Sequence, residues 1–270
     1  MRRLVSFSCD GRRLAATVDE AAGSVGLLVI SGGNEIRAGA HRGMAKLAGD
    51  VAAAGFPVFR FDRRGIGDSE GENCGFTSSA LDIDAAIASF RDQCPTMKKI
   101  VAFGNCDAAS ALVLHRPKGI AAALLANIWT IETTPEEGPP PAAIRARYKE
   151  KLLQPREWVR LISGGVNIIK LAKGLLRVAA PAHSASLSLS IANGLEAFEG
   201  PVEIIVCNRD ATAIAFMDEF QKSHFQKARA RCDLNIVQLD SASHSFASVQ
   251  DYEVLKSISV RLLKGAEPRP

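Results

Sequence analysis

The sequence predicts an α/β fold in which a mostly parallel β-sheet carries helices on both faces. Short, continuously apolar runs recur along the chain, and each is followed by a longer segment whose apolar residues return at helical spacing. A strand buried on both faces needs such a run, because helices cover both of its sides. The 270 residues, of which 47% are hydrophobic and 23% charged, suit one globular unit with a large core.

The first half of the chain gives the elements in a regular order. Residues 3–9 and 12–18 alternate around Asp10-Gly11, which predicts a β-hairpin. The apolar run 25–30 predicts a buried strand, and 43–54 a helix that ends at Gly55. The elements expected next are a strand at 57–62, a glycine-rich loop at 63–69, a helix at 79–93, a strand at 99–103, a helix from 109 and a strand at 120–126.

The alternation stops between residues 133 and 197. A proline-rich stretch at 133–141 opens this segment, and residues 142–197 have a helical pattern without a clear strand. The sheet pattern then resumes with a strand at 202–207, a helix at 212–229, a strand at 234–239 and a final helix near 247–263. We therefore divide the chain into an α/β core, residues 1–132 and 198–270, and an inserted helical cap, residues 133–197.

The most informative stretch is Gly104-Asn105-Cys106-Asp107-Ala108. It lies between a predicted strand and a predicted helix, which is the setting of the nucleophile elbow Gly-x-Ser-x-Gly. Small residues are needed there because the nucleophile's backbone is strained and the next helix packs closely. Cys106 holds the nucleophile position, and Ala108 replaces the second glycine. Read alone, Cys106 could equally be a small buried apolar residue.

Two later residues complete a triad in the order nucleophile, acid, histidine. Asp210 follows the strand at 202–207, and His244 follows the strand at 234–239. All three candidates lie at the carboxyl ends of strands, where active sites of open α/β sheets form. The histidine would take the thiol proton, and the carboxylate would orient the histidine. Asp240 is the alternative acid, and Asp210 could instead only cap the next helix.

An oxyanion formed at Cys106 would need backbone N–H donors. One donor is expected from Asp107, the residue after the nucleophile. The second is expected in the loop after the strand at 25–30, from Gly33 or, as second choice, from Asn34. Nearby, we expect Gly65-Ile66-Gly67 to form a tight turn, because no phosphate-loop lysine follows it. The remaining candidates are assigned structural roles: an ion network of Asp62, Arg63 and Arg64, and the histidines His41, His115, His183 and His224.

Composition and spacing argue against several other classes of function. The net charge is +4, the basic residues are scattered and aromatics make up 6%, so no nucleic-acid-binding face is expected. The six cysteines have no CxxC spacing, so we expect no metal site, and no other cofactor. Reduced thiols of this kind are typical of a cytoplasmic protein. We expect neither a signal peptide nor stable membrane insertion, since no uninterrupted apolar run approaches the ~20 residues of a membrane helix.

Three stretches together resemble the exosortase A system-associated hydrolases, which are bacterial α/β-hydrolases encoded beside exosortase and exopolysaccharide genes. They are Ser31–Arg37, Phe59–Gly71 and Gly104–Ser110. The resemblance implies the α/β-hydrolase fold over most of the chain and is weakest at 133–197. By position it implies Cys106 as nucleophile, Asp210 as acid and His244 as base. It implies no substrate, because the family name records gene neighbourhood.

The sequence therefore predicts a hydrolase that acts on a small ester or thioester through an acyl-Cys106 intermediate. Amide hydrolysis is disfavoured, because a thiolate leaves more readily than an alkoxide when an amine must be expelled. Three alternatives stay open: an acyltransferase with the same triad, a non-catalytic binding protein on this scaffold, and a redox sensor whose thiol oxidises reversibly.

Overall fold

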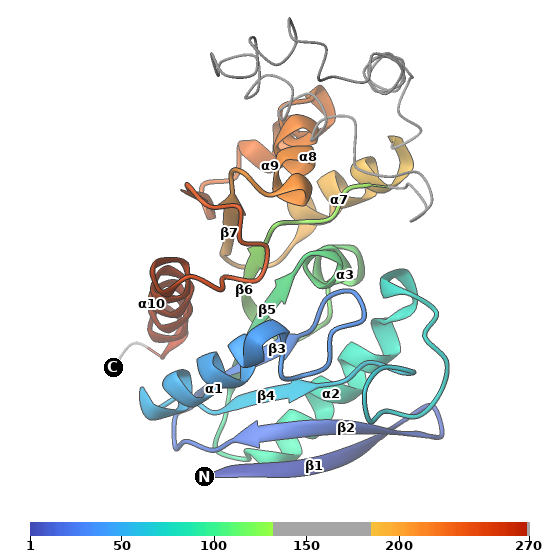
Figure 1. Ribbon diagram of the computed structural model, residues 1–270, viewed down its shortest axis with the longest axis vertical. Helices are drawn as coiled ribbons and strands as arrows, with labels where there is room; N and C mark the ends of the chain where they lie inside the picture. Colours follow the sequence, from blue (N-terminus) through green and yellow to red (C-terminus); the bar gives the residue numbers. More distant parts are fainter. Residues whose placement is uncertain (132–184, 269–270) are drawn as a thin grey trace, which may run out of the picture.

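The computed structural model describes residues 1–131 and 185–268 of the chain (Figure 1). Its centre is an eight-stranded sheet with the order β1-β2-β4-β3-β5-β6-β7-β8. The strands are β1 (Arg2–Cys9), β2 (Arg12–Asp19), β3 (Val25–Ile30), β4 (Val58–Phe61), β5 (Lys99–Asn105), β6 (Ile120–Ala126), β7 (Val202–Cys207) and β8 (Leu234–Leu239). The predicted α/β fold with a mostly parallel sheet is confirmed.

Only the first two strands depart from the parallel arrangement. β1 and β2 form the predicted hairpin, with Cys9 opposite Arg12, and β2 runs antiparallel to β4. Asp10 and Gly11 take φ values of 51° and 71°, the positive φ that a two-residue turn needs to match the right-handed twist of its strands. Every other neighbouring pair is parallel. The carboxyl ends of β3 to β8 therefore meet at one edge of the sheet.

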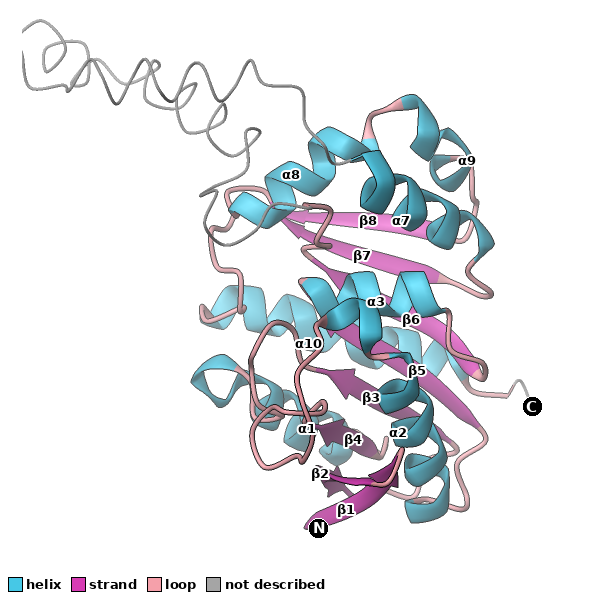
Figure 2. Cartoon of the chain, turned by 90° about the vertical axis from the view of Figure 1, so that its right-hand side faces the viewer, coloured by secondary structure: helices cyan, strands magenta, loops and turns pink. Residues whose placement is uncertain are grey.

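Helices cover both faces of the sheet, as Figure 2 shows from the side. The helices in the described ranges are α1 (Gly43–Ala53), α2 (Ala80–Gln93), α3 (Asp107–His115), α7 (Ala185–Ala197), α8 (Ala211–Phe220), α9 (Gln226–Arg229) and α10 (Val249–Ala266). On β3, Leu27 and Val29 face a core cluster with α1 and α10, while Leu28 and Ile30 face a second cluster with α2, α3, α7 and α8. Burial on both faces explains the unbroken apolar run of this strand. No helix in the described ranges could cross a bilayer, being too short or too polar.

The cap predicted at 133–197 lies outside the described residues except for α7. This helix packs on α3, and its Ile191 and Leu195 are fully buried in the core cluster on that face of the sheet. A Cβ at Gly194 would lie 2.4 Å from the carbonyl oxygen of Val113, so the glycine lets the two helices approach closely. Residues 185–197 are thus continuous with the sheet's own helical layer.

The helix predicted at 212–229 is interrupted, which corrects that expectation. α8 ends at Phe220, Lys222 is extended, a single turn follows at Ser223–Phe225, and only then does α9 begin. The Arg229 guanidinium donates to the carbonyl oxygens of Phe220 and Lys222, the latter at 2.9 Å. A side chain therefore satisfies the carbonyl group of the last residue of α8 and supports the linker that follows it.

Candidate active site

Cys106 stands at the tip of a strained turn between β5 and α3. Its φ and ψ are 60° and −126°, a conformation that is costly for a residue with a side chain. The surrounding backbone holds it there: the Cys106 N–H donates to Ala126 O at 2.9 Å, and its carbonyl accepts from the Ser110 N–H at 3.3 Å. The half-buried thiol consequently sits at the N-terminus of α3.

Two glycines make room for this turn. A Cβ at Gly104 would lie 2.7 Å from backbone atoms of Ala108 and Ala109, so α3 could not pack where it does. A Cβ at Gly32 would lie 2.4 Å from Asn105 O and 3.3 Å from Cys106 Cβ. The loop after β3 therefore lies directly against the turn that carries the thiol, where an oxyanion loop is needed.

Asp210 combines the two roles that the sequence left open. It precedes α8, and its Oδ1 accepts from the Thr212 and Ala213 N–H groups at 3.1 and 3.0 Å. The same oxygen lies 3.1 Å from Nδ1 of His244. Burial alone would raise the pKa of the Asp210 carboxyl, but the hydrogen bonds from His244 and the two backbone groups lower that pKa overall. Asp210 is thus an anionic helix cap that also holds the histidine.

His244 connects Asp210 to Cys106. The hydrogen bond with Asp210 contributes most, and the interaction with the Cys106 side chain next, to a pKa of His244 that is raised to about 10 against the opposing effect of burial. The imidazole consequently carries its proton at neutral pH. The structure brings together Cys106, His244 and Asp210. Asp240 stands apart, with a side chain that is 82% exposed and paired with Arg209 at 3.1 Å.

A pair of side-chain amides, not identified from the sequence, holds the loop of His244. Asn105 and Asn127 both donate to the carbonyl oxygen of His244, at 3.0 and 3.3 Å. Asn127 also donates to Asn105 Oδ1 at 3.2 Å and accepts from the Cys207 N–H at 3.0 Å. It is fully buried, with a φ of 44°. An asparagine directly after the apolar strand Ile120–Ala126 was the signal in the sequence that could have identified it.

The predicted oxyanion donors lie together but are not equally available. Asp107 is the first residue of α3, where no intrahelical acceptor exists for its N–H. The N–H of Gly33 donates instead to Asp107 Oδ1 at 2.6 Å. In the described parts of the chain the N–H of Asn34 has no acceptor, while its side chain accepts from Asn73 Nδ2 at 2.9 Å.

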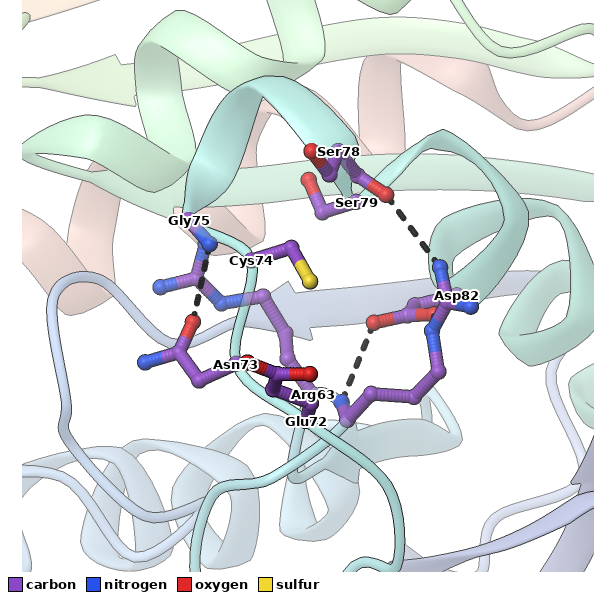
Figure 3. A pocket seen from close by; sticks show the side chains of 9 residues that line it. Arg63, Glu72, Asn73, Cys74, Gly75, Ser78, Ser79 and Asp82 are labelled. Carbon is purple, nitrogen blue, oxygen red and sulfur yellow. Dashed lines mark hydrogen bonds and ion pairs between the residues drawn. The ribbon is translucent and has the colours of Figure 1, made fainter.

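In the loop after β4, Asp62, Arg63 and Arg64 pair with different partners and not with one another, unlike the predicted shared network. Asp62 pairs with Arg37, Arg63 lies 3.5 Å from Asp107, and Arg64 lies 2.5 Å from Asp82. The predicted tight turn is present: the Ile66 N–H donates to Arg63 O and the Ser69 N–H to Ile66 O, each at 3.0 Å, and Gly67 has a φ of 56°. Figure 3 shows the adjacent polar pocket, which is lined by Arg63, Arg64, Glu72, Asn73, Cys74, Gly75, Ser78, Ser79 and Asp82.

Two of the remaining histidine candidates bond to groups other than Cys106 or His244. His115 bonds to Phe76 O at 3.1 Å and His224 to Ser188 Oγ at 2.9 Å, while His183 lies outside the described residues. Burial raises the pKa of the Cys9 and Cys207 thiols to about 11 in each case. Within residues 1–131 and 185–268 no group of three or more His, Cys, Asp or Glu side chains could hold a metal ion.

Comparison with known proteins gives structural neighbours only. No protein-family model and no curated protein sequence matches the chain. An esterase of Pyrococcus furiosus matches with a TM-score of 0.67 and 16% identity, over 98% of this chain and 92% of that one.

Two further solved structures show the same likeness. The α/β-hydrolase GrgF of a Penicillium species matches with a TM-score of 0.64 and 20% identity, over 98% and 99% of the two chains. An esterase of Exiguobacterium antarcticum matches with a TM-score of 0.62 and 12% identity, over 96% of this chain and 99% of that one. Together with the mostly parallel eight-stranded sheet, these matches establish that the chain has the α/β-hydrolase fold.

Proposed function

We propose that this protein hydrolyses a small ester or thioester through a Cys106–His244–Asp210 triad. The observation that carries the proposal is the backbone of Cys106, strained at φ 60° and ψ −126°. Strain of this kind persists where the surrounding structure enforces it, and it is concentrated at active sites. Here it supports a thiol that is hydrogen-bonded to a histidine, which is in turn bonded to a carboxylate.

The chemistry follows from this order of contacts. The Cys106 sulfur, its proton transferred to His244, attacks the carbonyl carbon, and the C=O electron pair moves onto oxygen. Backbone N–H groups stabilise that oxyanion. The oxyanion then re-forms the C=O bond and expels the alkoxide or thiolate, which takes the proton from His244. Asp210 keeps the imidazole in the correct tautomer and stabilises its charge.

Hydrolysis of the acyl-Cys106 intermediate repeats these steps with water. His244, now neutral, removes a proton from water as the oxygen attacks the acyl carbon, and it returns that proton to the Cys106 sulfur as the thiol is expelled. An alcohol or amine in place of water would make the same protein an acyltransferase. Hydrolysis is the preferred form, because it requires no second substrate.

Two of the structural neighbours are named as esterases, which supports ester chemistry for this chain as well. The three motif stretches that resemble the exosortase A system-associated hydrolases support a finer proposal, namely that the chain is a bacterial member of that group. The proposal includes a cytoplasmic location, for which the free cysteines are the supporting observation.

The test is a screen of p-nitrophenyl esters and acyl-CoA thioesters of graded chain length. Cys106→Ala should abolish turnover, and brief exposure of the wild type to substrate should add one acyl mass to the peptide containing Cys106. Cys232→Ala is the matched control, since that thiol is exposed and free. Wild-type turnover by Cys106→Ala would refute the proposal, and reversible oxidation of Cys106 without ester turnover would favour the redox sensor.

A further inference from the structure

A single ion pair holds both polar backbone groups of Gly33 beside the nucleophile. The Gly33 N–H donates to Asp107 Oδ1 at 2.6 Å, and the Gly33 carbonyl accepts from Arg63 Nη2 at 2.5 Å. The same Arg63 nitrogen lies 3.5 Å from Asp107 Oδ2. Gly33, Asp107 and Arg63 therefore form a closed ring of contacts, and Gly33 is the residue that the sequence predicted as the second oxyanion donor.

In this arrangement the Asp107 carboxylate accepts the hydrogen bond of the Gly33 N–H, a donor that the proposed reaction needs. A Cβ at Gly32 would lie 3.2 Å from Asp107 Oδ1 and 3.3 Å from Cys106 Cβ, so the carboxylate lies close to the thiol. An N–H that already donates to a carboxylate is not free for a substrate oxygen. A fixed negative charge there would also repel the oxyanion that the reaction forms.

Arg63 offers the carboxylate a second place to bind. Its side chain is 4% exposed, and its Nε and Nη1 atoms are buried without a partner in the described parts of the chain. A guanidinium binds a carboxylate best through two adjacent nitrogens. Nη2 belongs to both such pairs, and the other nitrogen is unpaired in each. Figure 3 shows the Arg63 side chain along the wall of the polar pocket near Asn73 and Gly75.

We propose that Asp107 and Arg63 are positioning residues that open the oxyanion hole. When a substrate carbonyl enters, Asp107 leaves the Gly33 N–H and forms a two-pronged pair with Arg63. The freed N–H then donates to the carbonyl oxygen together with the N–H of Asp107. The inference rests on the proposed function, because it concerns the same site, but it can be tested without turnover.

The probe is an alkyl trifluoromethyl ketone followed by ¹⁹F NMR. The Cys106 sulfur adds to the ketone carbon and the C=O electron pair moves to oxygen, giving a reversible tetrahedral adduct with no leaving group. His244 keeps the thiol proton, so the adduct oxygen is anionic and reports the oxyanion hole. Iodoacetamide provides the reference, since the sulfur displaces iodide at a saturated carbon and forms no oxyanion.

Arg63→Gln should lower the affinity of Cys106 for the ketone ~10²-fold, which is the usual effect of losing one oxyanion donor, while the rate of alkylation by iodoacetamide serves as the reference. Asp107→Ala should bind the ketone at least as tightly as the wild type. The double variant that combines Asp107→Ala with Arg63→Gln should regain the binding that Arg63→Gln alone loses. Arg60→Gln is the matched control, because Arg60 is also buried and ion-paired, to Asp19, and should leave the adduct unchanged. If Arg63→Gln does not fold, Arg63→Lys keeps the charge without the two-nitrogen fork and should also weaken the adduct.

Loss of ketone binding in Asp107→Ala, or no recovery of binding in the double variant, would overturn the proposal. The Asp107–Arg63 pair would then have a purely structural role. Absence of any ketone adduct in a wild type whose Cys106 is alkylated would overturn it too. A wild type that forms the adduct but turns over no ester would refute the proposed function alone and leave this inference standing.

Discussion

A single oxygen of Asp210 both caps α8 and holds His244. Asp210→Asn separates these roles, because asparagine is as good a helix cap as aspartate but cannot hold the required histidine tautomer. We expect kcat to fall ~10⁴-fold, as in the serine-protease precedent, with little change in the free energy of unfolding. Steady-state kinetics and urea melts measure the two effects. The matched control is Asp240→Asn, whose carboxylate is 82% exposed and should be dispensable; a larger kcat defect in this variant would transfer the role to Asp240.

The raised pKa of His244 predicts how stability depends on pH. Folding raises this pKa from 6.5 to about 10, so the folded state binds the proton more tightly than the unfolded state. The resulting stabilisation is complete below about pH 6.5 and is lost as pH rises toward 10. The difference in free energy of unfolding between wild type and His244→Gln should therefore shrink across this window. Urea melts at intervals of pH test it, and a difference that stays constant with pH would contradict the assignment.

At the scale of elements, the contact between β5 and α3 depends on Gly104. An added Cβ would meet backbone atoms at 2.7 Å, and backbone cannot move aside as a flexible side chain can. Gly104→Ala should cost about 1–3 kcal/mol of stability and should reduce the alkylation rate of Cys106, because α3 must shift. Gly265→Ala in α10 is the control, since nothing lies within 4 Å of its added Cβ and alanine is the better helix former. Equal stability of the two variants would show that the turn tolerates a shift of α3.

Local pattern was sufficient for most elements and for the proximity of Cys106, Asp210 and His244, whose catalytic role stays a prediction. Continuous apolar runs predicted the buried strands, and the order of Cys106, Asp210 and His244 at strand ends predicted which side chains meet. The break after Phe220 was not predictable, because it depends on Arg229 reaching back to carbonyl oxygens. The hydrogen bond from the Gly33 N–H to Asp107 was not predictable for a similar reason, because residues 33 and 107 meet only in the folded chain. Contacts of side chains with distant backbone leave no periodic signal in a sequence.

At the scale of the whole molecule, the described strands and the helices that cover them form one sheet unit. All eight strands, and the helices that cover them, lie in residues 1–131 and 185–268. α7 belongs with this unit, because Ile191 and Leu195 are buried against its core. Any replacement of the predicted cap should therefore retain α7 and remove only residues 133–184.

We predict that residues 133–184 set the chain-length preference for acyl substrates. Replacing them with a Gly-Ser linker should leave the fold and the reaction of Cys106 with iodoacetamide intact, because the eight described strands and the residues Cys106, Asp210 and His244 all lie elsewhere. The ratio of kcat/KM between long and short p-nitrophenyl esters should change, since an inserted segment at the carboxyl edge of the sheet would supply part of the acyl pocket. A second variant that also removes α7 is the control and should lose stability through its exposed core residues. An unchanged chain-length profile after the 133–184 replacement would mean that the loops of the sheet alone form the acyl pocket.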